Sequence, residues 1–321
     1  ILSVLDAKPA FAGIDIDYES LMASDRDNYS AFMEDLSTEV HAAGKIITTA
    51  VHTKVGPGTW YGPQAQDFQR IGNAVDEILF MTYDLHWATS PTYSNPPPTA
   101  GCQSTPDWMN DVAMFGISEI ADPSKIQLGL PFYGYRWKYL FENHDLNDPG
   151  LGLTHQDAQD LIEQYNISSS QINREPNGNE PYFNVEIDGI EWTCYFQDAL
   201  SLEYKLSALA YTIPFYSFLM KKKIADFLSK NKIEAIHIHD IRIAEAVFLA
   251  NKKQQLPVVL DLHDNMPEVM KFYPHLQKFP GKYIISPKKW KRKEEAFIKK
   301  ADKRITVTQE FVNELVDRTK I

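Results

Sequence analysis

Short apolar stretches that alternate with helical segments restrict the fold of this chain more than any other feature. Strands are predicted at residues 11–18, 45–52, 77–87 and 125–137, and helices between them at 29–43, 64–74 and 108–119. Nearly continuous apolar strands joined by helices are typical of parallel sheets, which are buried on both faces. The sequence therefore predicts an α/β fold with a parallel sheet or barrel, whose functional side chains gather at the carboxyl ends of the strands.

Two further regions follow these strands. Residues 138–198 are predicted to be an irregular insertion that contains a helix at 154–165 and a hairpin at 184–196, with its turn at Asp188–Gly189. After a helix at 198–210, strands are predicted at 233–240, 257–264 and 304–308, and helices at 218–231, 241–254, 288–301 and 309–319. Three strands joined by helices are typical of half of a doubly wound, Rossmann-like sheet.

The charge distribution divides the chain at the same place. From residue 213 onward there are 22 Lys and Arg against 13 Asp and Glu, whereas the preceding residues hold 10 against 30. Such asymmetry indicates separate modules, and 321 residues suffice for two domains. We predict domains at 1–210, with the insertion at 138–198, and at 211–321.

Other sequence features narrow the class of protein. No run of about 18 apolar residues predicts a membrane span, and no signal peptide opens the chain. Two cysteines, Cys102 and Cys194, do not make a disulfide scaffold, and the sequence leaves open whether they pair.

The stretch FAGIDIDYESL places three carboxylates, Asp15, Asp17 and Glu19, at every second position of a predicted strand. Alternate residues of a strand share a face, so these acids are expected on one face, with Ile14, Ile16 and Tyr18 on the other. Crowded carboxylates raise the pKa of at least one member, which can then act as a general acid; Glu19, nearest the strand end, is the candidate. A calcium site and a solvated acidic edge are the alternatives, although the strand lacks the turns of a calcium loop.

The stretch AGIDIDYE resembles the DGxDxDxE motif of glycoside hydrolase family 18, the chitinases and related N-acetylglucosaminidases. MTYDLHW (81–87) and LGLPFYGYRW (128–137) are similar to the sixth- and seventh-strand segments of that family, and the insertion is similar to its α+β subdomain. The resemblance covers residues 3–209 in the family's order. It implies part of a TIM (β/α)8 barrel, from about the fourth strand to the seventh.

The resemblance also implies a retaining, substrate-assisted hydrolysis of β-1,4-linked N-acetylglucosamine polymers, without a cofactor or metal. Glu19 would protonate the glycosidic oxygen while the acetamido carbonyl of the sugar attacks its own anomeric carbon. Asp17 would orient the acetamide, with Asp15 sharing a proton behind it. The remaining residues carried over are Tyr83 and Asp84 around the acetamide, and Met81, Tyr133, Trp87 and Trp137 as walls against the sugar. For Trp87 and Trp137, packing in the core is the alternative.

The sequence departs from the family in two ways. Ala12 replaces the first Asp of the motif, and YTIPFYSFL (211–219) stands where the eighth strand and its Trp are expected. A barrel without half of its strands leaves edges and an apolar lumen open, so we expect weak or no hydrolysis by this chain.

From about residue 211 onward the chain resembles the N-terminal half-domain of GT-B glycosyltransferases of family 4, through 236–268 and 299–315. A transferase fragment is therefore the second functional hypothesis, and a non-catalytic, lectin-like binder the third. Because the hydrolase resemblance suggests export and the transferase resemblance the cytoplasm, no compartment is predicted, and a fusion of two fragments is a further hypothesis. The sequence does not indicate an oligomeric state.

Two polar features of this second half also have competing interpretations. His237, His239, Asp240, His263 and Asp264 end two neighbouring strands, and their spacing fits the lining of a cleft better than a zinc pattern. The Lys-rich stretch 286–300 is interpreted as a solvated helix face rather than a nucleic-acid or lipid contact. The predicted partner is the N-acetylglucosamine-containing glycan that the hydrolase resemblance implies.

Overall fold

The computed structural model describes the chain except for residues 59, 90–99, 139–148, 213–215, 263–264 and 273–285. Its contacts divide the chain into two compact units, Ile1–Leu206 and Ser207–Ile321, which we call unit 1 and unit 2. The assignment of residues 1–210 and 211–321 to domains of separate origin stays a prediction.

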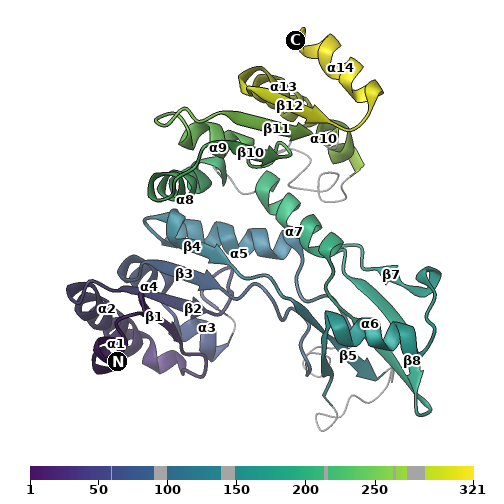
Figure 1. Ribbon diagram of the computed structural model, residues 1–321. Helices are drawn as coiled ribbons and strands as arrows, with labels where there is room; N and C mark the ends of the chain where they lie inside the picture. The colour runs from purple at the N-terminus through teal and green to yellow at the C-terminus, as the bar shows by residue number, and fades with distance from the viewer. Residues whose placement is uncertain (59, 90–99, 139–148, 213–215, 263–264, 273–285) are drawn as a thin grey trace. The chain divides into compact units, whose positions relative to one another are not determined.

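Unit 1 contains a four-stranded parallel sheet in the order β1-β2-β3-β4 (Figure 1). The strands are β1 (Gly13–Asp17), β2 (Ile46–Val51), β3 (Glu77–Phe80) and β4 (Ile126–Leu128). Each strand pairs with the next strand of this sheet along the chain, as expected when helices make the crossovers. The predicted parallel α/β arrangement is therefore confirmed.

Helices cover one face of this sheet. They are α1 (Leu2–Ala7), α2 (Arg26–Ala42), α4 (Phe68–Ala74) and α5 (Pro106–Glu119), and the short helix α3 (Tyr61–Ala65) follows β2. In α2, Met33, Leu36 and Val40 are buried at helical spacing and pack into the same core as Ile16 and Ile78 of the sheet. Burial of each such side chain contributes about 1.5–3 kcal/mol relative to exposure, so this apolar face holds the helix on the sheet.

The opposite face of the sheet is polar and open around β1. Ile16 is buried under the helices, whereas its neighbours Asp15 and Asp17 are exposed, as the alternation in the sequence predicts. Tyr18 is half exposed, yet its ring lies 6.0 Å from that of Phe32 on α2, on the helical side. One strand thus supplies an apolar layer and a row of acids together.

A second, five-stranded sheet of unit 1 has the order β6-β5-β9-β8-β7. Its strands are β5 (Tyr133–Lys138), β6 (Leu151–Thr154), β7 (Asn173–Arg174), β8 (Pro181–Ile187) and β9 (Ile190–Tyr195). The helix α6 (His155–Gln164) packs on it through Ala158. The predicted hairpin is confirmed, since Asp188 and Gly189 both have positive φ between β8 and β9.

Three predicted elements were wrong in extent. The predicted strand 125–137 is two strands, because β4 pairs with the parallel sheet and β5 with the insertion sheet, on either side of Pro131. The predicted strand 77–87 ends at Phe80. The predicted helix 64–74 is α3 and α4, since the side chain of Asp67 accepts a hydrogen bond from the Arg70 N–H and begins a new helix there.

Unit 2 contains a three-stranded parallel sheet of β10 (Ile236–His239), β11 (Val258–Leu262) and β12 (Lys303–Thr306), in that order. Its helices are α8 (Tyr216–Lys230), α9 (Ala244–Ala250), α10 (Met266–Val269), α13 (Pro287–Lys300) and α14 (Gln309–Thr319), and α7 (Ala199–Thr212) contains the division between the units. On α13, Trp290, Phe297 and Ile298 are buried, while Lys288, Lys289, Lys299 and Lys300 are exposed. This pattern agrees with a solvated Lys-rich face.

Both cysteines are buried and free. Burial raises the pKa of the Cys194 thiol to about 12 and that of Cys102 further still, so neither is a reactive thiolate near neutral pH. Within the described part of the chain, no helix has the length and apolar character needed to cross a bilayer.

Candidate active site

Four of the predicted site residues lie at or after the carboxyl ends of β1 and β3. Asp17 is the last residue of β1 and Glu19 follows it, while Tyr83 and Asp84 follow β3. Burial raises the pKa of the Tyr83 phenol, and the negative charges of Asp17, Asp84 and Glu19 raise it further. The three carboxylates therefore act on one phenol, and this cluster is the candidate active site.

Asp84 lies deepest in this group. It has a φ of 61°, a left-handed conformation that Asp tolerates better than most residues. The Tyr133 hydroxyl donates a hydrogen bond to its Oδ1 at 2.6 Å, and Tyr135 also bonds its carboxylate. Burial raises the pKa of Asp84, and the two tyrosine hydrogen bonds oppose that rise. The environment of Asp84 therefore favours its protonated form.

Tyr83 needs a glycine beside it. A Cβ on Gly129 would lie 2.6 Å from Cε1 of the Tyr83 ring, closer than carbon atoms approach. The Thr82 hydroxyl donates to the Gly129 carbonyl at 2.7 Å, which fixes the two segments side by side. The short segment between β4 and β5 therefore sets the position of the tyrosine ring.

The backbone that carries Glu19 is held from β2 and α3. His52 Nε2 lies 3.0 Å from the Glu19 carbonyl, and Gln66 donates to the Tyr18 carbonyl at 3.1 Å. The half-exposed Trp60 ring packs edge-on against the His52 ring, with 4.7 Å between their centroids. The Glu19 side chain itself is exposed.

The other predicted residues are placed differently. The Thr48 hydroxyl donates to Asp15 across the β1–β2 pair. Trp137 is buried among aromatic rings of the insertion sheet and donates to the Trp87 carbonyl at 3.3 Å, so its indole packs in the core. Trp87 is 43% exposed and Met81 half-buried.

Sequence reasoning missed His52, Gln66 and Tyr135. His52 directly follows β2 as Asp17 ends β1, so the rule that site residues follow parallel strands could have found it. Tyr135 stands two residues after Tyr133 on one strand, and alternation places both on one face. No pattern in the sequence marks Gln66.

Replacing Asp84 with Asn should change the pH dependence of stability. Because the folded pKa of Asp84 is raised, its contribution to stability is fully present below the unfolded pKa and is lost as pH rises through the folded one. Asn lacks this titration and keeps the left-handed backbone. We therefore expect the free energy of unfolding of Asp84→Asn to increase relative to that of the wild type as the pH rises from about 4 to about 8. Denaturation at both pH values measures this difference.

Tryptophan fluorescence suits this measurement, because every tryptophan except Trp290 belongs to unit 1. Asp35→Asn, at an exposed position of α2, is the matched control and should follow the wild type at both pH values. Equal pH dependence in the two variants would show that Asp84 is not buried in solution.

The histidine cluster predicted in unit 2 is present only in part. Nitrogens of His237 and His239 lie 3.3 and 3.8 Å from Oδ2 of the buried Asp261, while His263 and Asp264 lie outside the described residues. The described residues contain no group of three or more His, Cys, Asp and Glu side chains arranged to hold a metal ion.

Two protein-family models match the chain. The model described as glycosyl hydrolases family 18 matches residues 1–235, and that described as glycosyltransferase family 4 matches residues 199–321. The matches overlap around α7 and α8.

Individual relatives agree with the first match. The cortical fragment-lytic enzyme of Bacillus subtilis is 28% identical over 203 residues, which cover 62% of this chain and 43% of that protein. The crystal structure of the Bacillus cereus spore cortex-lytic enzyme SleL has a TM-score of 0.55 at 25% identity, covering 70% of this chain and 46% of that one. The crystal structure of the putative sporulation-specific glycosylase YdhD from Bacillus subtilis has a TM-score of 0.56 at 22% identity, covering 66% of each chain, and shows the likeness of fold. The chain spans less than half the length of the curated relatives it matches.

Proposed function

Because this chain belongs to glycosyl hydrolases family 18, we propose that unit 1 hydrolyses glycans that contain β-1,4-linked N-acetylglucosamine, by a retaining, substrate-assisted route. The observation that carries the proposal is the position of Asp17 and Glu19 at the carboxyl end of β1 and of Tyr83 and Asp84 after β3, where the three carboxylates raise the pKa of the Tyr83 phenol. We also propose that β1–β4 correspond to strands four to seven of a TIM-like barrel, and that unit 2 corresponds to part of a Rossmann-like half-domain.

Each residue then has a defined part in the reaction. Glu19 donates a proton to the glycosidic oxygen as that bond breaks, and the acetamido oxygen of the same sugar bonds to the anomeric carbon to give an oxazolinium ion. Asp17 offsets the positive charge of this ion, and the Tyr83 hydroxyl donates to the acetamido oxygen. Water then attacks the anomeric carbon and returns a proton to Glu19, which restores the acetamide.

The surroundings of Glu19 predict a slow enzyme. Asp15, Asp17 and Glu19 are exposed, so water competes for their hydrogen bonds and screens their charges. Electrostatic stabilisation of a transition state is strongest in sites that exclude water. Solvent exposure of the acids therefore supports the expectation of weak or no hydrolysis that follows from the departures of the sequence.

The proposal predicts a requirement for the acetamido group. Full-length protein should release chromophore from a 4-nitrophenyl N,N′-diacetylchitobioside slowly, and from the matched cellobioside not at all, because the cellobioside lacks the nucleophile. The measurement is initial rates at equal concentrations of both substrates, with the anomer of the first product followed by NMR. Retention of the β configuration is expected.

Other outcomes favour the other candidates. Equal rates on both substrates would rule out substrate assistance. Binding of chitooligosaccharide without hydrolysis would support a lectin-like binder. The family 4 match supports a glycosyltransferase fragment as the second candidate, and binding of a nucleotide sugar with no response to the chitobioside would favour it.

A further inference from the structure

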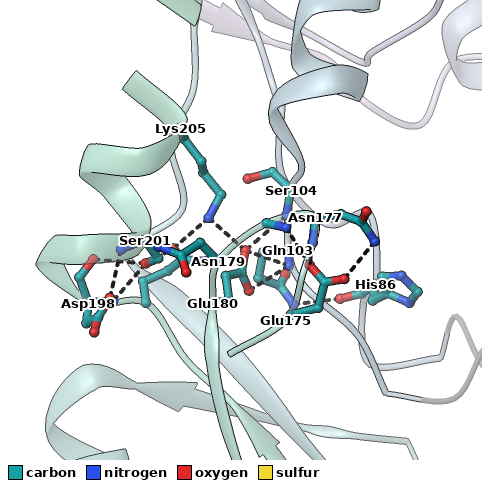
Figure 2. Close-up of polar contacts among 12 residues, drawn as sticks. His86, Gln103, Ser104, Glu175, Asn177, Asn179, Glu180, Asp198, Ser201 and Lys205 are labelled. Carbon is teal, nitrogen blue, oxygen red and sulfur yellow. Dashed lines mark hydrogen bonds and ion pairs between the residues drawn. The ribbon is translucent and has the colours of Figure 1, made fainter. Parts of the chain in front are cut away.

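A fully buried ion pair lies outside the cluster of acids described above. The Lys205 ammonium on α7 lies 3.0 Å from Oε1 of Glu180, the residue before β8, and neither side chain is exposed (Figure 2). Burial raises the pKa of Glu180, and the Lys205 charge and the Gln103 N–H oppose that rise. None of the steps of the proposed reaction uses these two residues.

The Glu180 carboxylate also holds a piece of backbone. The Gln103 N–H lies 3.0 and 2.9 Å from its two oxygens, and the Ser104 N–H lies 3.2 Å from Oε1. Lys205 also donates to Oε1 of Gln197 at 3.1 Å, and Figure 2 shows it reaching from α7 toward this cluster. The pair therefore fastens the segment before α5 to the insertion sheet and to α7.

That segment in turn holds the backbone next to Asp84. The Leu85 N–H donates to the Gln103 carbonyl at 2.9 Å, and the Gln103 side-chain amide donates to the His86 carbonyl at 2.7 Å. A Cβ on Gly101 would lie 2.6 Å from the His86 ring, so the two segments are packed as closely as glycine permits. Two hydrogen bonds and one close contact thus connect the ion pair to the residues after Asp84.

A buried ion pair is a poor means of adding stability. Removal of two charges from water costs several kcal/mol per ion, and apolar side chains of similar volume often stabilise a fold equally well. A carboxylate is needed here because it offers two oxygens to adjacent N–H groups, which apolar side chains cannot do. The chemistry of the pair therefore points to placement of backbone.

We propose that Glu180 and Lys205 are positioning residues of the active site, which set the place of Asp84 through Gln103 and the Leu85–His86 backbone. The inference rests on the proposed function. A misplacement of about 1 Å at a reacting group can lower a rate by about 10²-fold. The contacts from Glu180 through Gln103 to Leu85 and His86 therefore affect kcat, although neither Glu180 nor Lys205 touches the substrate.

The test is the double variant Glu180→Gln with Lys205→Met, which removes both charges and keeps both shapes. Gln offers one acceptor oxygen instead of two, so the Gln103 N–H loses its contact with Oε2. We expect hydrogen exchange of the Leu85 amide to accelerate about 10-fold and kcat on the chitobioside to fall about 10-fold, with KM within about twofold of wild type. Glu180→Asp, which keeps the charge but withdraws the oxygens, should give the same pattern if the double variant does not fold.

The matched control is the double variant Arg70→Met with Glu34→Gln, which removes the same charges from a pair that joins α2 to α4. Its Leu85 exchange and kcat should equal those of the wild type. Unchanged hydrogen exchange of the Leu85 amide in the Glu180 variants would show that the ion pair does not hold this segment. Faster exchange with unchanged kcat would show that the ion pair has no positioning role. If the wild type does not hydrolyse the chitobioside, the proposed function fails, whereas Leu85 exchange still decides whether the pair holds this segment.

Discussion

Replacing Glu19 with Gln should lower kcat on chitooligosaccharides by about 10²-fold, the lower end of what a general acid contributes. The lower end is expected because the Glu19 side chain is exposed, so solvent can protonate the leaving group in its place. The loss should be smaller for a 4-nitrophenyl substrate, whose leaving group needs little protonation. Steady-state rates on the two substrate types measure this difference.

Glu39→Gln, an exposed change on α2, is the control and should retain the activity of the wild type. Binding of chitotetraose to Glu19→Gln should be within about threefold of wild type, because a general acid acts mainly in the transition state. An equal loss on both substrate types would mean that Glu19 does not donate the proton.

Replacing Lys205 alone with Met should destabilise unit 1 by about 3–5 kcal/mol, because it leaves the buried Glu180 carboxylate without its counter-charge. The loss should shrink as pH falls, since protonation removes the unpaired charge. Urea denaturation followed by tryptophan fluorescence, at neutral and at acidic pH, measures this loss of stability.

Lys8→Met, at an exposed position of the same unit, should leave the unfolding midpoint unchanged. Adding Glu180→Gln to Lys205→Met should recover most of the lost stability, because the charge left behind is then absent. A loss below about 1 kcal/mol for Lys205→Met would put the pair at the level of surface ion pairs and contradict its burial.

The sequence predicted the parallel sheet well, because its strands depend on local patterns. β2 and β11 consist mostly of apolar and β-branched residues, and in β1 the alternation around Ile16 placed the acids on one face. Such features require no knowledge of distant contacts. The roles of the residues that follow β1 and β3 came from the family resemblance and stay predictions.

What the sequence could not predict depends on tertiary contacts. Residues 125–137 were predicted to be one strand, yet β4 and β5 pair with different sheets. The ion pair between Glu180 and Lys205 could not be predicted, because the two residues share no sequence motif and a buried charge follows no periodic pattern. The burial of Trp137 likewise depends on its place within the antiparallel sheet.

The split between β4 and β5 has a consequence for the acidity of Asp84. Its carboxylate follows a strand of the parallel sheet, whereas the hydroxyls that stabilise its charge belong to Tyr133 and Tyr135 of the antiparallel one. Along the chain, the segment 129–132 joins β4 of the parallel sheet to β5 of the antiparallel one. Any sliding of one sheet past the other would lengthen these hydrogen bonds and make Asp84 a weaker acid. The protonation state of Asp84 therefore reports how closely the two sheets are packed.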